Sequence, residues 1–155
     1  MSAPLPDAVA SGPVIFAYDG CELAELAIAE AGRQLAPGRD ALVLCVWQPA
    51  DVGFVPVGDR RFDAQNAAEV QEAAEQTAAY GASLAAKAGF RSQSMAVEAA
   101  PTWKGIVETA EEHQAGLIVL GSHRRSGPFK RLIGSVAAAV VSHSTTSVLV
   151  VHQRP

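Results

Sequence analysis

The chain has 155 residues, of which 49% are hydrophobic and 18% are charged, and its formal net charge is −4. This length predicts one domain that buries roughly 68–70% of the surface its unfolded chain exposes, without a metal or disulfide framework. The acidic balance argues against nucleic-acid binding, and no apolar stretch reaches the roughly 20 residues of a membrane span.

The N-terminal residues and the cysteines predict the cellular compartment of the protein. Residues 1–12 lack the basic and apolar regions of a signal peptide, and neither Cys21 nor Cys45 lies in a Cys-x-x-Cys pair. We therefore expect a soluble cytoplasmic protein with reduced thiols. A flexible N-terminal arm, 1–12, precedes a single domain, 13–155.

Five short β-type runs alternate with four helical stretches along this domain. Most of the runs are apolar at consecutive positions, which is typical of strands covered on both faces of a parallel sheet. The pattern predicts an α/β fold of repeated strand–helix–strand units. The predicted elements are strand 14–18, a helix that follows Asp19-Gly20 and stops at Pro37-Gly38, strand 41–47, helix 63–87, strand 93–99, helix 102–113, strand 117–120, helix 135–143 and strand 147–151.

The first predicted strand ends in Tyr18-Asp19-Gly20. Asp19 has the position of an N-cap for the following helix, and Glu22, three residues later, has the spacing of a capping box. In open α/β sheets ligands lie beyond the carboxyl ends of the strands, so the Asp19 carboxylate can also face a ligand. The two interpretations are compatible.

The segment 121–135 joins the fourth strand to the fourth helix and holds Arg124, Arg125, Lys130 and Arg131. A strand that leads through a basic, glycine-bearing loop into a helix start is how α/β proteins present backbone donors to a phosphate. Gly134 lets an anion approach the backbone, and Ser135 offers a hydroxyl and an N-cap. The segment therefore predicts a nucleotide site, in which His123 is either a ligand contact or a solvated loop residue.

Other features leave open choices or argue against a known site. The chain lacks the Rossmann glycine fingerprint, the P-loop and the serine elbow of hydrolases, and its four histidines lack metal-ligand spacing. Trp47 either walls a base pocket or packs on a helix, and packing is the commoner outcome for such a residue. The linker 48–62 is either a lid or a plain connection.

Taken together, these features resemble the universal stress protein family over residues 14–152. The first strand ends in Asp-Gly, the fourth reads Leu-Ile-Val-Leu-Gly-Ser-His, and the chain closes on Gly-Ser-Val followed by Ser-Val-Leu-Val-Val. The ATP-binding members share a motif of Gly, two residues, Gly, nine residues, Gly, then Ser or Thr. Here that spacing holds Gly121, Arg124, Gly134 and Ser135, so an arginine replaces the second glycine.

The resemblance implies a three-layer α/β sandwich of the adenine nucleotide alpha hydrolase-like type, with a five-stranded parallel sheet of order 3-2-1-4-5. It implies ATP as the ligand, with or without Mg²⁺, the adenosine near the first and second strands, and the phosphates along the loop and the fourth helix. The implied contacts are Ala17, Tyr18, Asp19, Val46, Leu120, Gly121, His123, Arg124, Gly134, Ser135 and Val136.

The resemblance also implies a homodimer through the last strand, Val148, Leu149, Val150 and Val151. Such a protein is a nucleotide-binding dimeric regulator of the stress response, with at most slow ATP hydrolysis. Two departures, Arg124 for glycine and Ala137 for a hydroxyl residue, favour an alternative, a dimeric interaction module that works without nucleotide. If position 124 needs a positive φ, the arginine costs about 1–2 kcal/mol, which a direct phosphate contact would offset.

Overall fold

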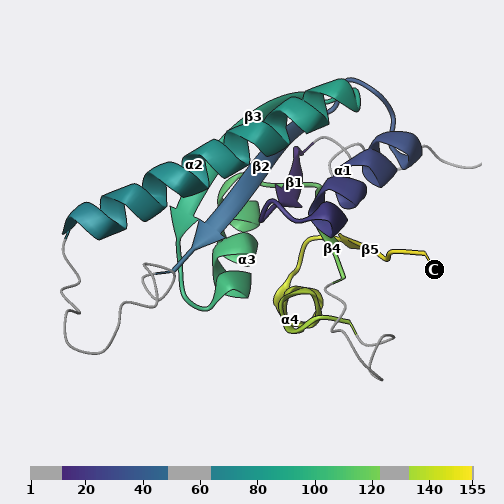
Figure 1. The fold of residues 1–155 in the computed structure, drawn as a ribbon. Helices are drawn as coiled ribbons and strands as arrows, with labels where there is room; N and C mark the ends of the chain where they lie inside the picture. Colours follow the sequence, from purple (N-terminus) through teal and green to yellow (C-terminus); the bar gives the residue numbers. More distant parts are fainter. Residues whose placement is uncertain (1–11, 49–63, 123–132, 155) are drawn as a thin grey trace, which may run out of the picture.

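The computed structural model of the chain describes residues 12–48, 64–122 and 133–154. These residues form one parallel sheet of strand order β3-β2-β1-β4-β5, with helices between successive strands (Figure 1). The predicted α/β class and the implied strand order are confirmed. The elements are β1 (Val14–Ala17), α1 (Glu22–Gln34), β2 (Asp40–Trp47), α2 (Ala64–Lys87), β3 (Arg91–Glu98), α3 (Thr102–Glu112), β4 (Leu117–Gly121), α4 (Ser135–His143) and β5 (Val148–Val151).

The predicted bounds agree closely with the observed ones. Helix α4 lies where the sequence predicts it, whereas α1 ends at Gln34, before the predicted stop at Pro37. Strand β3 begins two residues early because Arg91 already pairs with Asp40 of β2, and its Nε lies 2.9 Å from the Asp40 carboxylate. The predicted arm 1–12 and linker 48–62 lie outside the described residues, apart from Gly12 and Gln48.

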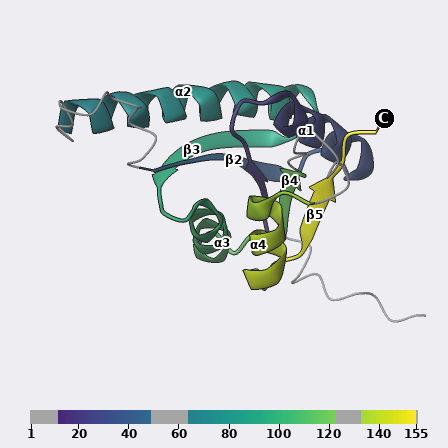
Figure 2. The ribbon, with the colours of Figure 1, turned by 60° about the horizontal axis from the view of Figure 1, so that its bottom comes forward.

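Each face of the sheet is covered by two helices. Helices α1 and α2 lie on one face, and α3 and α4 lie on the other (Figure 2). In β1, Val14 and Phe16 pack with α1 and α2, whereas Ile15 packs with α3 and α4. A strand buried on both faces needs apolar side chains at consecutive positions, which explains the apolar runs of the sequence.

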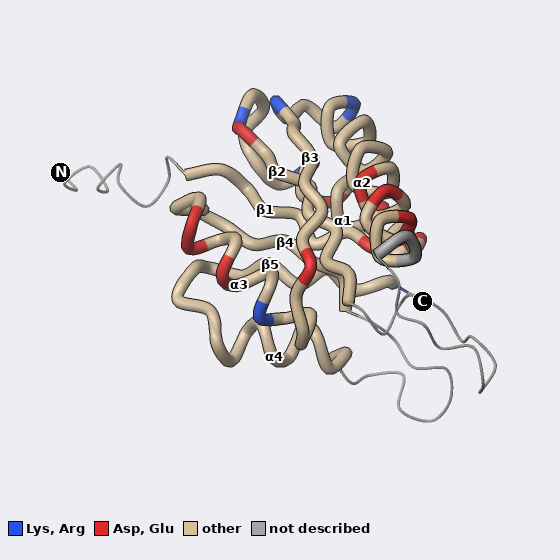
Figure 3. The backbone as a smooth tube through the Cα atoms, turned by 90° about the vertical axis from the view of Figure 1, so that its left-hand side faces the viewer, with Lys and Arg blue, Asp and Glu red and all other residues tan. Residues whose placement is uncertain are grey.

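The charged residues of the described ranges lie on the helices, in loops and at the ends of strands (Figure 3). Basic segments gather where β2 and β3 begin, since Arg39 directly precedes β2, Arg91 begins β3 and Lys87 ends α2 (Figure 3). The acidic residues Glu69, Glu72 and Glu75 of α2 are exposed. The carboxyl ends of the parallel strands lie at the opposite edge of the sheet. Within the described ranges, no helix has the length and apolar character needed to cross a membrane.

Candidate functional site

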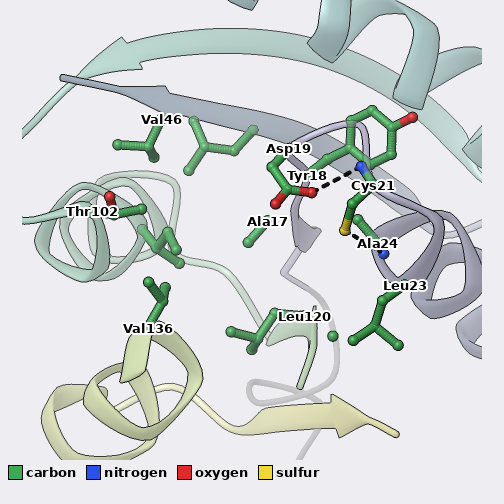
Figure 4. Close-up of a pocket in the computed structure, with 13 residues that line it drawn as sticks. Ala17, Tyr18, Asp19, Cys21, Leu23, Ala24, Val46, Thr102, Leu120 and Val136 are labelled. Atoms are coloured by element: carbon green, nitrogen blue, oxygen red, sulfur yellow. Dashed lines mark hydrogen bonds between the residues drawn. The ribbon is translucent and has the colours of Figure 1, made fainter. Parts of the chain in front are cut away.

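A cavity of about 100 Å³ opens at the carboxyl ends of the central strands β1 and β4 (Figure 4). The chain leaves these two strands toward opposite faces of the sheet, since α1 follows β1 and α4 follows β4. Open α/β sheets bind their ligands at such a switch point. The cavity is lined by Ala17, Tyr18, Asp19, Cys21, Leu23, Ala24, Leu44, Val46, Thr102, Ile106, Leu120, Gly121 and Val136.

The backbone of β2 reaches past the end of β1 at this cavity. Leu44 C=O accepts from Tyr18 N–H at 2.9 Å, and Trp47 C=O accepts from Ala99 N–H on the β3 side at 3.0 Å. Because alternate residues of a strand direct their backbone groups to the same neighbour, Val46 N–H and C=O point to the β1 side, as those of Leu44 do. Strand β1 has already ended there, so Val46 directs one donor and one acceptor toward the cavity.

The turn between β1 and α1 corrects one prediction. Asp19 is not the N-cap of α1: its Oδ1 accepts from Cys21 N–H at 3.0 Å, which is the side-chain turn that Asp favours. The N-cap is Cys21, whose Sγ accepts from Ala24 N–H at 3.4 Å. Glu22 is therefore the first residue of the helix and takes no part in a capping box.

Two ionisable groups of the cavity wall are held neutral. Burial, and then the hydrogen bond with Asp19, raises the pKa of the Cys21 thiol, so the N-cap sulfur carries its proton at neutral pH. Burial and the nearby Glu25 carboxylate raise the pKa of Tyr18 to about 12. The Tyr18 hydroxyl donates to Glu25 Oε1 at 3.4 Å. Among the described lining residues, Asp19 is therefore the charged one.

Helices α3 and α4 begin at the same cavity without a side-chain cap. The N-caps are Pro101 and Gly134, and neither makes a side-chain hydrogen bond to its helix. The predicted N-cap role of Ser135 is wrong, because Ser135 is the first helical residue and is exposed, while Gly134 is buried. Uncapped helix starts leave backbone N–H groups that an anion can satisfy, and the helix dipole favours that anion.

A buried hydroxyl follows the cavity wall at the end of β4. Ser122 comes directly after Gly121 and is 1% exposed, and its side-chain oxygen has no hydrogen-bond partner in the described part of the chain. An unpaired buried hydroxyl costs roughly 1–3 kcal/mol. Ser122 is not itself a lining residue of the cavity, whereas the open start of α4 beside it suits a ligand that brings anionic oxygen atoms. The described side chains contain no group of three or more His, Cys, Asp or Glu residues that could hold a metal ion.

Gly121 sets how closely α1 approaches β4. A Cβ atom at this position would lie 2.6 Å from Leu23 Cγ, closer than carbon atoms pack. The missing side chain lets Leu23 of α1 lie against the end of β4, where both residues line the cavity. The glycine is thus needed for close packing, whatever binds beside it.

The structure brings most of the predicted contacts to this one place. Ala17, Tyr18, Asp19, Val46, Leu120, Gly121 and Val136 all line the cavity. Gly134 and Ser135 begin α4 directly before Val136. His123 and Arg124 lie outside the described residues, and the nucleotide contacts of all these positions stay predictions.

Some residues of the site were not predicted. Thr102, the first residue of α3, lines the cavity, and its Oγ1 accepts from Gln48 Nε2 at 2.6 Å. No local pattern marks this pair, because the two residues come together only through the fold. Trp47, by contrast, packs on α2 with Ala74 and Ala78, and its Nε1 donates to Gln71. The packing interpretation of Trp47 is confirmed, and its ring is not part of the cavity wall.

Comparison with known proteins gives a consistent family. The model of the universal stress protein family matches residues 11–152. A universal stress protein of Mycolicibacterium smegmatis is 32% identical over 143 residues, which are 92% of this chain and 46% of that protein. The chain therefore spans about half the length of the curated relative it matches.

Solved structures show the same fold. The hypothetical protein MJ0577 superposes with a TM-score of 0.76 at 22% identity, covering 94% of this chain and 98% of that one. A universal stress protein in complex with cAMP superposes with a TM-score of 0.62 at 25% identity, covering 92% and 97%.

Proposed function

Because the chain belongs to the universal stress protein family, we propose that it binds an adenine nucleotide at the carboxyl edge of its sheet, with ATP as the ligand. One observation carries the proposal: two uncapped helix starts and the Val46 backbone converge on a single cavity at the switch point of the sheet. The solved relative that holds cAMP supports an adenine nucleotide as the class of ligand.

The volume of the cavity indicates that only part of the nucleotide lies inside it. A volume of about 100 Å³ is small beside the roughly 300–1,000 Å³ of a complete small-molecule site. The cavity therefore takes the base, between the apolar side chains of Leu120 and Val136. The exocyclic amine of adenine donates to Val46 C=O, and a ring nitrogen accepts from Val46 N–H. Ala17 and Tyr18 complete the wall on the β1 side.

The charges of the site order the rest of the nucleotide. Each carboxylate oxygen has two acceptor positions, so Asp19 can accept a ribose hydroxyl in addition to its hydrogen bonds with Cys21. The same negative charge repels phosphate, which favours the far side of the cavity. There the start of α4 offers open N–H groups at Gly134 and Ser135, and the dipole adds about 0.3–1 kcal/mol. His123 and Arg124 belong to this phosphate region in the proposal, with or without Mg²⁺.

We propose further that the protein acts as a homodimeric regulator in the stress response, joined through β5. Among the described strands, β5 pairs with β4 alone and is an edge strand with four apolar residues. In α4, a helix that contacts β5, Val141 is 50% exposed. An apolar edge is a template for pairing with a second copy. The same observation supports the alternative function, a dimeric interaction module that works without nucleotide.

Calorimetric titration of the purified chain with ATP, in the presence of Mg²⁺, tests the binding proposal. We expect micromolar affinity for the wild type and a clear loss for Asp19→Ala and Gly134→Val. Asp40→Ala is the matched control, because Asp40 lies at the opposite edge of the sheet beside Arg91. An absence of binding at millimolar ATP would contradict the proposal and favour the nucleotide-independent module, which loses function only when β5 is disrupted, as in Leu149→Glu.

A further inference from the structure

The geometry points to Thr102 as a base-reading residue, held in position by Gln48, that donates a hydrogen bond to adenine beside Val46. The inference rests on the proposed nucleotide function and adds to it the group that selects the base. It concerns a side chain of α3, on the wall of the cavity opposite α1 (Figure 4).

Thr102 and Val46 stand together on the same side of the cavity, and the Thr102 oxygen turns toward β2 (Figure 4). Gln48 follows β2 two residues after Val46, and its Nε2 donates to Thr102 Oγ1 at 2.6 Å. This contact ties the start of α3 to the end of β2. The threonine oxygen is thus fixed close to the backbone groups that face the base.

The remaining question is where the Thr102 proton goes. A hydroxyl offers one donor and two acceptor positions, and Gln48 occupies one of the acceptor positions. Threonines inside a helix commonly donate to the carbonyl four residues earlier, as Thr77 does to Ala73 at 2.9 Å. Thr102 is the first residue of its helix, so no helical carbonyl precedes it. In the described part of the chain Thr102 Oγ1 accepts from Gln48 and donates to no other group, which leaves its proton for a ligand.

Adenine has the acceptors that this arrangement requires. Its exocyclic amine is flanked by two ring nitrogens, N1 and N7. Val46 takes the amine and one of these nitrogens, and Thr102 donates to the other. Cytosine also carries an amine beside a ring nitrogen, but a C–H group stands on the other side of the amine. A cytosine base would pair with Val46 and leave the Thr102 proton without an acceptor.

The consequence is a preference for adenine over cytosine that depends on one hydroxyl. A site built to hydrogen-bond a ligand group discriminates against a ligand that lacks it, because a polar group is left unpaired. The loss of one such hydrogen bond corresponds to about tenfold in affinity. Thr102 is therefore the residue that distinguishes adenine from a base which satisfies Val46 alone.

The experiment measures ATP, 1-deaza-ATP, 7-deaza-ATP and CTP by calorimetry against the wild type, Thr102→Val and Thr102→Ser. We expect the wild type to bind both deaza analogues and CTP more weakly than ATP. The analogue that lacks the nitrogen facing Thr102 should lose about tenfold in affinity. Thr102→Val should lose about tenfold for ATP and lose nothing further for that analogue. Thr102→Ser keeps the hydroxyl and should keep the wild-type pattern.

Thr109→Val, the same change on a buried residue of the same helix away from the cavity, is the control for altered helix packing. Thermal unfolding of each variant confirms that it is folded. The role of Thr102 is contradicted, while nucleotide binding stands, if Thr102→Val binds ATP as tightly as the wild type does. It is also contradicted if both deaza analogues lose as much affinity relative to ATP with Thr102→Val as with the wild type. A wild type that binds none of the four ligands overturns the proposed function and this inference together.

Discussion

Helices α1 and α4 both begin at the cavity, yet their first turns are built in opposite ways. At α1, Cys21 Sγ accepts from Ala24 N–H, and Asp19 accepts from Cys21 N–H, so side chains of the turn satisfy two of its N–H donors. At α4, the N-cap is a buried glycine with no side-chain hydrogen bond. One helix start is closed by the chain, and the other is open to a ligand.

The difference shows that one helix start can form the wall of the cavity while the other offers N–H groups to an anion. The closed start of α1 places Leu23 against Gly121 and fixes the wall of the cavity. The open start of α4 needs no cap of its own, because Ala137 and Val140 anchor the helix in the core. We infer that the anionic part of a ligand belongs at α4 and the neutral part beside α1 and β2.

Closing the open helix start should have the largest effect. Gly134→Asp places a carboxylate at the N-cap of α4, where it takes the free N–H groups and repels phosphate. Each hydrogen bond to a charged group contributes about 1.5–3 kcal/mol, so losing two weakens ATP binding by about a hundredfold or more. Calorimetric titration measures this loss.

Adenosine is the control ligand for Gly134→Asp, because it has no phosphate. Its affinity should change little, whereas ATP and ADP should both lose affinity. Equal losses for adenosine and ATP would mean that the α4 start contacts the base or ribose, or that the variant distorts the cavity.

Alkaline pH tests the closed side of the cavity through Tyr18. Its pKa is raised to about 12 by burial and then by Glu25, whereas an unfolded tyrosine titrates near pH 10. The unfolded chain therefore releases this proton at a lower pH than the folded chain does. The stabilisation that Tyr18 contributes is fully present below about pH 10 and is lost between about pH 10 and 12. Over that pH range, the free energy of unfolding in urea should fall by about 1–2 kcal/mol more for the wild type than for Tyr18→Phe.

Tyr80→Phe is the matched control, because Tyr80 is 56% exposed and lies on α2. It should keep the wild-type dependence on pH. If Tyr18→Phe loses stability as steeply as the wild type, the environment of Tyr18 does not hold the phenol neutral.

Changing the N-cap of α1 should have an effect of about 1 kcal/mol. A thiol is a weak acceptor, so Cys21→Ser should strengthen the cap and Cys21→Ala should remove it. We expect the serine variant to be about 1 kcal/mol more stable than the alanine variant in urea unfolding without nucleotide. Equal stabilities would show that the contact between Cys21 and Ala24 contributes nothing to α1.

The comparison of the two helix starts also explains which parts of the site the sequence could predict. Consecutive apolar residues mark the strands, and the Gly134-Ser135 start marks α4, because both depend on local chemistry. The predicted N-cap of α1 is wrong because cysteine is an unusual N-cap residue. Asp19, a residue type that is common at N-caps, lies two residues earlier in a turn. Strand order came from the family resemblance rather than from local patterns.

Contacts between distant segments could not be predicted in the same way. Gln48 and Thr102 are 54 residues apart, and each alone is an ordinary polar residue at the end of an element. Their hydrogen bond exists because β2 and α3 are brought together at the carboxyl edge of the sheet. The unpaired hydroxyl of Ser122 could not be predicted from the sequence either, because no local pattern shows that this serine is buried.

The smallest effect we expect is that of Gln48→Met, which removes the amide that holds Thr102 but keeps the length of the side chain. The threonine hydroxyl remains and can still donate to the base, but it must be ordered when ATP binds. Ordering one side chain costs about 0.5–1.5 kcal/mol, so ATP affinity should fall by about threefold, less than for Thr102→Val. Gln93→Met, on the exposed edge strand β3, is the control. A loss larger than that of Thr102→Val would mean that Gln48 contacts the nucleotide itself and that Thr102 serves mainly to position it.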